Sequence, residues 1–365
     1  TRKLAIGNEY KINEKLNTNI IGIVTRTKTG YFGGNPIKVS VDEAWIGGNK
    51  RKQIVSDIID KYRYRSSWDQ INTNTVKYNA VCGGCGRVMY TGDDGEAYVR
   101  RIDPWEVVLL DAIDPSNPPA ALRVYTTREL EFTGKWTEVK HCTYYDAQWV
   151  IELIQTADGA WVARDVKEHF FGACPLWIVP NNEELQGDVE EVLSLQDSYD
   201  TILSDLASEI QQLRLAYMFF KNITLDESMM RRAIQTGAFA ITDKDETNKS
   251  EIGFITKNIS IDPVKFAEQT IRDNMMTVTG TPNFNDQAFA GNPTGVAIGY
   301  KLVNLENRCI QAEQEFKRAL DHEFRLLAHF YRIKRNIDID PSAITYTFNR
   351  NLPKNLEAEA NLINN

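Results

Sequence analysis

Residues 280–297, GTPNFNDQAFAGNPTGVA, separate two long helical patterns, and the architecture of the second half of the chain follows from this arrangement. The stretch contains a single charge, Asp286, and two aromatic side chains, Phe284 and Phe289. Its Asn292-Pro293 pair is typical of a helix start, because asparagine caps the first free N–H groups and proline fits the first turn. Long irregular loops inside compact domains are often functional. The sequence therefore predicts a helix, a functional loop and a second helix.

The two flanking helices are marked by apolar residues at steps of three and four. The helix before the loop begins at Asp262-Pro263 and ends at Gly280. The helix after it carries its apolar stripe from Ile298 to Tyr331 and extends to about Arg335, which is about 42 residues and roughly 60 Å. We expect so long a helix to bridge domains or to line an interface in an oligomer, because a single domain of this size does not bury such a length.

A third helical pattern occupies residues 187–219, about 30 residues and roughly 45 Å long. Its apolar stripe runs from Val192 to Tyr217. Its other face is acidic and carries one base, Arg214; the acids are Asp188, Glu190, Glu191, Asp197, Asp200, Asp205 and Glu209. A face so strongly of one sign suggests a field effect beyond ordinary solvation.

A small α/β module is expected between this helix and the one at 262–279. Thr224 followed by Glu227 is a capping-box pattern that opens a short helix. Strand-like runs follow at 238–242 and 253–256, on either side of the charged loop 243–246. Residues 218–258 therefore read as an insert between two helices.

The first half of the chain alternates strands with a few helices, which indicates the α+β class. β-branched residues favour a strand at 20–24, and residues 53–62 fit a short amphipathic helix. Gly92-Asp93-Asp94-Gly95 is a hairpin signal, and Ala157-Asp158-Gly159 is a second one. The predicted strands lie at 37–39, 88–90, 97–99, 106–110, 121–126, 138–145, 148–154 and 344–348.

Length and composition limit the classes of protein. The 365 residues suffice for about two or three domains, and 42% hydrophobic with 25% charged residues is ordinary for a folded chain. No apolar run approaches the roughly 18 residues of a membrane helix, and no secretory signal is present. The chain starts at Thr1 without a methionine and stops in a polar run, so we expect a trimmed or processed piece. A net charge of −8 excludes a broad basic face that grips nucleic acid.

Cysteine chemistry offers one alternative reading. Five cysteines are too few and too uneven for a disulfide framework, which places the chain in a reducing compartment. Cys82-Gly83-Gly84-Cys85 reads best as two free thiols in a turn that enters a strand, with half of a zinc site and a redox pair as alternatives. A zinc- or thiol-dependent enzyme using this pair, Cys142 and a histidine is the runner-up function. His322 and His329 lie in the long helix, where surface or interface roles are expected.

Catalytic motifs are absent from the sequence. Residues 291–295 lack the Gly-Lys-Ser/Thr ending of a phosphate loop, and there is no GxSxG, HExxH or strand-linked GxGxxG. We expect no enzymatic activity, no cofactor and no bound metal.

The ordered features resemble the portal proteins of tailed bacteriophages of the long-tailed siphophage type. Residues 171–176 (FGACPL), 180–183 (PNNE), 187–190 and 195–200 (LQDSYD) are similar to the segment that opens the family's first long helix. Residues 280–284 and 289–297 look like its tunnel loop and the start of its long kinked helix. Residues 345–350 (TYTFNR) resemble its last wing strand, and residues 31–37 match more weakly.

The resemblance implies a phage portal fold in a ring of about twelve subunits at one capsid vertex, through which double-stranded DNA is packaged and ejected. It implies an α/β wing, two stem helices, a small clip, a tunnel loop and the start of a crown. The corresponding residues are 1–184 with 294–350 (wing, including the long kinked helix and wing strand), 185–217 and 259–279 (stem), 218–258 (clip), 280–293 (tunnel loop) and 351–365 (crown). Little chain follows Arg350, so we expect the crown to be short or mostly missing.

The resemblance also implies partners: the large terminase, the major capsid and scaffolding proteins, a head-completion adaptor, and no membrane. The protein would be assembled in the host bacterial cytoplasm and end in the virion. The expected DNA-facing residues are Thr281, Asn283, Phe284, Asn285, Asp286, Gln287, Phe289 and Asn292. Candidates for lining the channel are Lys265, Arg272 and Lys301. The clip residues expected to face terminase or adaptor are Glu227, Arg231, Arg232, Asp243, Lys244, Asp245 and Glu246.

The charge of the chain agrees with such a role. Twelve copies of −8 give a ring of about −96. Each phosphate that a protein neutralises adds to tight, salt-dependent binding, so a channel with few basic groups favours sliding of DNA. Phe284 and Phe289 fit either DNA contact or packing between neighbouring loops.

Overall fold

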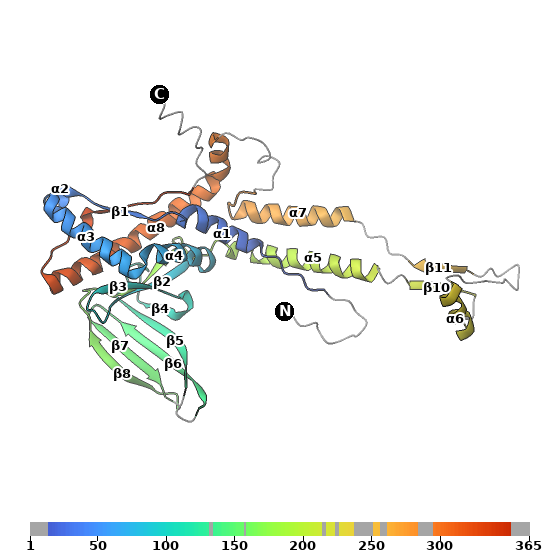
Figure 1. The fold of residues 1–365 in the computed structure, drawn as a ribbon, viewed down its shortest axis with the longest axis horizontal. Coiled ribbons are helices and arrows are strands. Elements are labelled where there is room, and N and C mark those ends of the chain that lie inside the picture. Colours follow the sequence, from blue (N-terminus) through green and yellow to red (C-terminus); the bar gives the residue numbers. More distant parts are fainter. Residues whose placement is uncertain are drawn as a thin grey trace. The chain divides into compact units, whose positions relative to one another are not determined.

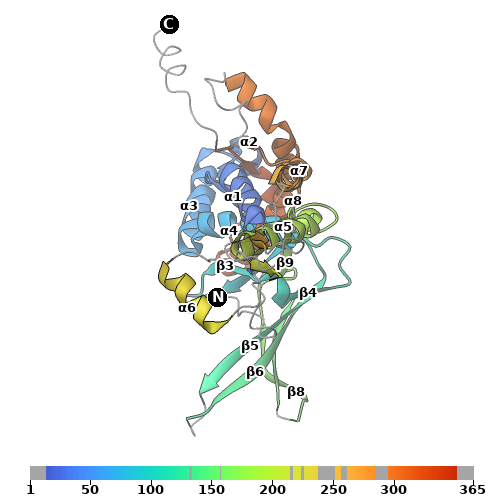
Figure 2. The same ribbon diagram turned by 90° about the vertical axis from the view of Figure 1, so that its right-hand side faces the viewer.

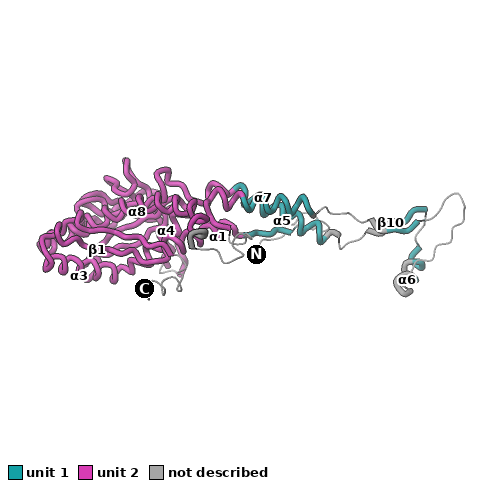
Figure 3. Tube along the Cα trace, turned by 90° about the horizontal axis from the view of Figure 1, so that it is seen from above, with its two compact units in different colours: residues 1–18, 194–273 teal, residues 19–193, 274–365 magenta. Residues whose placement is uncertain are grey.

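The computed structural model describes residues 14–130, 134–156, 158–213, 217–222, 226–236, 251–255, 261–283 and 295–351. The chain divides into two compact units, one made of residues 1–18 with 194–273 and the other of residues 19–193 with 274–365 (Figure 3). We call them unit 1 and unit 2. Helices and sheets are both extensive, so the predicted α+β class is confirmed.

Unit 2 has a helical core built around one long helix. Helix α8 spans Gly295–Arg335, and it packs with α1 (Ile20–Gly33), α3 (Asn49–Ser66) and α4 (Trp68–Cys82) (Figure 1). The short α2 (Glu43–Ile46) precedes α3. The buried side of α8, from Leu302 to Tyr331, supplies the largest share of this core.

The length predicted for α8 is confirmed, and the premise that a single domain does not bury such a helix is wrong. That α8 lines an interface in an oligomer stays a prediction. The helix has 41 residues, but most of its apolar stripe is buried within one unit. Because α1, α3 and α4 pack against it and strand β12 (Ile344–Thr347) follows it, a single unit covers the stripe over this length.

The strand predicted at 20–24 is wrong, because these residues open helix α1. The Asn19 side chain caps the helix by accepting a hydrogen bond from Gly22 N at 2.8 Å. Ile20, Val24, Lys28 and Phe32 are all buried, at steps of four residues. This single buried face outweighs the weak preference of β-branched residues for strands.

Three antiparallel sheets complete unit 2, and the strands predicted for this region are confirmed. Strands β2 (Gly84–Thr91), β3 (Ala97–Ile102) and β9 (Leu176–Pro180) form one sheet in the order β3-β2-β9. A five-stranded sheet has the order β4-β5-β6-β7-β8, with bounds Val107–Leu110, Ala120–Leu130, Trp136–Tyr145, Trp149–Gln155 and Trp161–Glu168. Strand β1 (Lys38–Val41) pairs with β12. Figure 2 shows β5, β6 and β8 extending well beyond the helices of unit 2.

A buried ion pair fixes α8 against the β2 strand. Arg87 Nη1 lies 2.8 Å from Glu323 Oε2, and both side chains are fully buried. Glu323 Oε1 also accepts hydrogen bonds from Tyr62 and Trp68, at 2.9 and 2.7 Å. Asn72 accepts from Arg87 Nη2 at 2.6 Å, so most of the buried charge is satisfied.

Unit 1 contains helices α5 (Leu193–Leu213), α6 (Glu227–Thr236) and most of α7 (Ile261–Val278), and the hairpin of β10 (Tyr217–Lys221) with β11 (Glu251–Ile255). The helix predicted at 187–219 is shorter, because a 3-10 turn (Glu190–Val192) precedes it and Tyr217 belongs to β10. Tyr199 Oη donates to Glu268 at 2.7 Å, which joins α5 to α7.

Two further predictions in unit 1 have different outcomes. The strand at 253–256 is confirmed as β11. Helix α6 forms, and Asp226 accepts a hydrogen bond from Ser228 N at 2.9 Å at its start. The predicted cap Thr224 and the strand at 238–242 lie outside the described residues.

Candidate functional site: the base of the 281–294 loop

The loop predicted to be functional leaves helix α7 through a closed turn. Thr281 N donates to Met276 O at 2.9 Å, and Gly280 N donates to Thr277 O at 3.1 Å. Thr279 Oγ1 donates to Met275 O at 2.8 Å. Gly280 has a φ of +66°, the left-handed conformation of a helix C-cap. The end of α7 is therefore hydrogen-bonded, and the predicted stop at Gly280 is confirmed.

Helix α8 lies directly against this turn. A Cβ at Gly280 would meet the backbone carbonyl carbon of Asn304 at 3.1 Å and its oxygen at 3.2 Å. Glycine is needed here both for its φ and for this close approach. The turn that starts the loop is thus in contact with α8.

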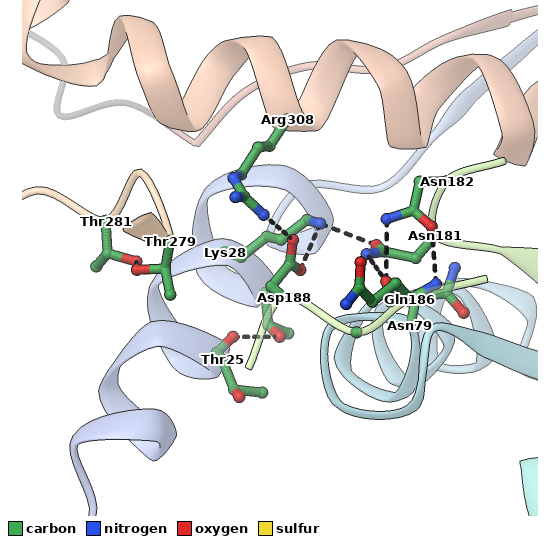
Figure 4. Close-up of polar contacts among 12 residues, drawn as sticks. Thr25, Lys28, Asn79, Asn181, Asn182, Gln186, Asp188, Thr279, Thr281 and Arg308 are labelled. Carbon is green, nitrogen blue, oxygen red and sulfur yellow. Dashed lines mark hydrogen bonds and ion pairs between the residues drawn. The ribbon is translucent and has the colours of Figure 1, made fainter. Parts of the chain in front are cut away.

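Arg308, one turn beyond Asn304 on α8, joins three segments. Its Nη2 donates to the carbonyl of Val278 at 2.7 Å and to Glu191 Oε2 at 3.0 Å. Its Nη1 donates to Asp188 Oδ1 at 3.3 Å. One guanidinium therefore holds the last turn of α7 and the segment that leads into α5; Figure 4 shows its contact with Asp188.

A buried lysine completes the arrangement from α1. Lys28 Nζ lies 2.6 Å from Asp188 Oδ2 and donates to Asn181 Oδ1 at 2.9 Å. Lys28 and Asp188 are each only 3% exposed. Asn181 in turn donates to Gln186 O at 2.9 Å, which shapes the turn before Asp188 (Figure 4). Lys28, Asp188, Glu191, Val278 and Arg308 are hereafter the loop-base junction.

The junction has the chemistry of a structural anchor. Asp188 is surrounded by two cations, and charge-assisted hydrogen bonds of this kind are stronger than neutral ones. The contacts fix where the 281–294 loop departs. They offer no paired acid and base beside a nucleophile, which nucleophilic catalysis requires.

The sequence did not predict this junction. The sequence pattern places Asp188 on the acidic face of the helix predicted at 187–219, and it does not single out Arg308. A signal for Lys28 was available, because it falls at the buried i+4 spacing of Ile20, Val24 and Phe32. A lysine at such a position requires an acidic partner.

The expected DNA-facing residues are divided between described and undescribed segments. Thr281 is buried, its hydroxyl 3.0 Å from that of Thr279, and Asn283 is half-buried. The others lie outside the described residues: Phe284, Asn285, Asp286, Gln287, Phe289 and Asn292. Thr281 therefore belongs to the base of the loop.

The three candidate channel-lining bases lie in different units. Lys265 is exposed on α7 in unit 1, and Arg272, half-buried on the same helix, interacts with Tyr199. Lys301 is half-buried on α8 in unit 2. Because the two units are described separately, the structure does not bring Lys265, Arg272 and Lys301 together.

The expected clip residues are exposed where the structure describes them. Glu227 and Arg231 form an ion pair at 2.7 Å within α6, and Arg232 follows them on the surface. Asp243, Lys244, Asp245 and Glu246 lie outside the described residues.

The CxxC pair lies at a helix end, and the predicted turn into a strand is confirmed. Cys82 is the last residue of α4, Gly83 caps the helix with a φ of +77°, and β2 begins at Gly84. Burial raises the pKa of the Cys85 thiol to about 11, which disfavours the thiolate that metals and disulfides require. No cluster of three metal-ligating side chains occurs among the residues described above.

His322 is a core residue, so the predicted surface or interface role is wrong for it. Its side chain is 1% exposed, its Nε2 lies 3.0 Å from Cys174 O, and its ring packs edge-on against Trp177. Burial lowers the pKa of His322 to about 4, so it is neutral near pH 7. In the part of the chain that the structure covers, no helix combines the length and apolarity needed to cross a membrane.

Comparison with known proteins identifies the family. The portal protein of Clostridium phage phiCD119 is 22% identical over 206 residues, which cover 54% of this chain and 43% of that protein. This chain thus spans less than half the length of that relative. The family described as phage portal protein, SPP1 Gp6-like, matches residues 7–365. The chain therefore belongs to the SPP1 Gp6-like family of phage portal proteins.

Proposed function

We propose that this chain is one subunit of a ring of about twelve that forms the channel for double-stranded DNA at one vertex of the capsid. The observation that carries the proposal is the family match over residues 7–365. The members of this family are structural proteins of the phage particle, and neither comparison favours the alternative zinc- or thiol-dependent enzyme.

In this proposal the parts of the chain have separate tasks. Residues 1–184 with 294–350 form the wing, 185–217 and 259–279 the stem, 218–258 the clip, and 351–365 the start of the crown. The tunnel loop, 280–293, projects toward DNA. The large terminase, which supplies ATP hydrolysis, docks on the clip, and a head-completion adaptor replaces it. Major capsid and scaffolding proteins contact the ring, which is assembled in the host cytoplasm.

The loop-base junction supports a mechanical role for the tunnel loop. The loop starts from a hydrogen-bonded turn that is packed on Asn304 and tied by Arg308. A force on the loop would thus be transmitted to α8, whose buried side is the core of unit 2. A firmly based loop suits repeated, transient contacts with moving DNA.

The distribution of charge supports a channel through which DNA slides without being tightly bound. Asp197 and Asp205 are exposed on α5, whereas Asp188 is buried between Lys28 and Arg308. The acidic face of the first stem helix is therefore smaller than its sequence suggests, and the net charge of −8 still disfavours tight binding of phosphates. Lys265, Arg272 and Lys301 remain our candidates for sparse basic contacts in the channel.

Electron microscopy of the purified protein tests the ring. We expect rings of about twelve subunits with an open centre, and a compact monomer at all concentrations would refute the proposal.

Replacing Phe284, Asp286 and Phe289 together, as Phe284→Ala, Asp286→Asn and Phe289→Ala, tests the tunnel loop. We expect rings to form normally while packaging yield or retention of packaged DNA falls. The control is Trp45→Ala, which removes an aromatic side chain that is 65% exposed on α2. Unchanged yield and retention in the triple variant would exclude a DNA-facing role for the loop.

A further inference from the structure

The five-stranded sheet of unit 2 has one face formed by continuous apolar rows. Residues opposite each other in an antiparallel pair share a face, so the register defines these rows across the sheet. One row crosses all five strands and contains Val108, Leu122, Tyr144, Ile151 and Val166. The next row contains Val124, Cys142, Leu153 and Ala163. We call these nine residues the outer apolar face; Trp149 and Trp161 flank it on the same side of the sheet.

Several side chains of the outer apolar face are exposed to solvent. Val166 is 53% exposed, Val124 is 40% exposed, and both flanking tryptophans are also exposed. In Figures 1 and 2 no helix of unit 2 covers the ends of strands β5 to β8. An apolar row left open in this way is unusual for a solvent face, which normally alternates to polar residues.

The opposite face of the same sheet contains the contacts expected of an inner face. Ala121, Val107, Leu109 and Tyr145 pack in the cluster that includes strands β2 and β9. Further along, His141 Nε2 lies 2.7 Å from Thr127 Oγ1, and its ring stacks on Tyr125. Over β4 to β6 the inner face is therefore covered or hydrogen-bonded, whereas Val108, Val124 and Val166 of the outer face are 48%, 40% and 53% exposed.

The size of the outer apolar face suits a stable protein interface. Five strands spaced by about 4.8 Å make it about 19 Å wide, and the rows from Trp149 to Trp161 span about 20 Å. That is roughly 400 Å² of sheet surface. A standard interface buries about 800 Å² per partner, of which a little more than half is apolar, or about 450 Å².

Charge excludes a nucleic-acid partner for this face. Arg128 and Glu138, which lie on the same side of the sheet, pair with each other at 3.2 Å. Lys140 and Glu168 also lie on this side, and their charges are opposite in sign. Binding of DNA requires unneutralised cations, whereas an apolar surface without net charge suits another apolar surface.

We propose that a second copy of this chain covers the outer apolar face in the assembled oligomer. This inference rests on the ring proposed above. An apolar patch of a few hundred Å² is often a functional contact surface, and a partner that covers it permanently must be present in equal amount. A neighbouring subunit meets this condition, and interfaces that are permanent are the more apolar ones.

A charge introduced into the face tests the inference, and β8 provides a matched control. Val166 lies on the outer apolar face, and Val162, four residues earlier in the same strand and 49% exposed, lies on the opposite face. We expect Val166→Lys to fold with an unchanged melting temperature and to require at least a tenfold higher concentration for ring formation. Val162→Lys should assemble as the wild type does. Sedimentation measures the assembly, and circular dichroism confirms the fold.

The outcomes separate this inference from the proposed function. Rings formed equally well by both lysine variants would overturn the interface and leave the channel proposal intact. A wild-type chain that never forms rings would overturn both. In assembled particles, Val166→Cys treated with a thiol-to-amine cross-linker should give a product of two copies of this chain; a product with a different virion protein would overturn the assignment to a second copy.

Discussion

Replacing Arg308 by alanine removes the tie between α8 and the start of the tunnel loop. The guanidinium makes three contacts, to Val278 O, Glu191 and Asp188, at 2.7, 3.0 and 3.3 Å. The first contact closes a segment of 30 residues that contains the whole loop. We expect the turn at Gly280 and Thr281 to open more often without it.

The magnitude follows from the exposure of each partner. The hydrogen bond to the Val278 carbonyl is worth about 1 kcal/mol. The pair with Glu191, whose side chain is 36% exposed, adds about 0.5 kcal/mol. The buried Asp188 keeps Lys28 at 2.6 Å, so losing its second cation costs only about 1 kcal/mol more. The total is about 2.5 kcal/mol, which corresponds to an opening equilibrium about 60-fold larger.

Amide hydrogen exchange on assembled rings measures this opening directly. The Thr281 amide, which bonds to Met276 O, should exchange about 60-fold faster in Arg308→Ala. The matched control is Arg318→Ala on the same helix, because Arg318 forms a surface pair with Glu315 at 3.1 Å and lies away from the loop. Equal exchange rates at Thr281 in both variants would refute the role assigned to Arg308.

Three further predictions concern stability. Arg87→Leu should lower the unfolding free energy by about 3–5 kcal/mol, because it leaves the fully buried Glu323 without its cation. The double variant Arg87→Leu with Glu323→Leu should recover much of that loss. Additive losses in denaturant titrations would contradict the coupling of the two residues. Gly280→Ala should cost about 1–3 kcal/mol because of its positive φ and its 3.1 Å approach to Asn304, and an unchanged melting temperature would disprove the close contact. Because the pKa of His322 is about 4 in the folded chain, the unfolded chain binds a proton between pH 6.5 and 4 that the folded chain does not, so stability should fall by about 1.4 kcal/mol per unit as the pH drops through this range. His322→Asn should flatten that slope. If thermal melts of His322→Asn at several pH values still show the slope, His322 is not its source.

Local signals predicted the elements whose own residues determine them. The hairpin turn at Gly92 to Gly95, the strands β4 to β7 of the five-stranded sheet and the stop at Gly280 depend on turn chemistry and on alternation, and all are confirmed. The fifth strand, β8, was not among the predicted strands. The start of α7 is also set locally, by Asp262-Pro263 just inside its first turn.

Partners distant in the sequence determine what the sequence failed to predict. Residues 20–24 are helical because Lys28 and Phe32 extend their buried face, and Tyr217 is in a strand because it pairs with Ile255. The loop-base junction unites residues from 28 to 308, and no short window contains its pattern. In the sequence, the residues of the outer apolar face show only the alternation that is ordinary for strands. The register of the sheet is needed to tell which residues share a face and which face is covered.

The pairing of β1 with β12 has a consequence for the timing of synthesis. Lys38 pairs with Thr347, about 300 residues later in the chain, and the core around α8 closes over residues contributed by α1 to α4. At a synthesis rate of about 5–20 residues per second, strand β12 is made some 15–60 s after strand β1. During that interval the apolar faces of α1, α3 and α4 are synthesised but lack the helix α8 that covers them in the folded chain. Residues 194–273 of unit 1 are synthesised within that interval, and these 80 of the 309 residues between Lys38 and Thr347 make up about a quarter of the delay.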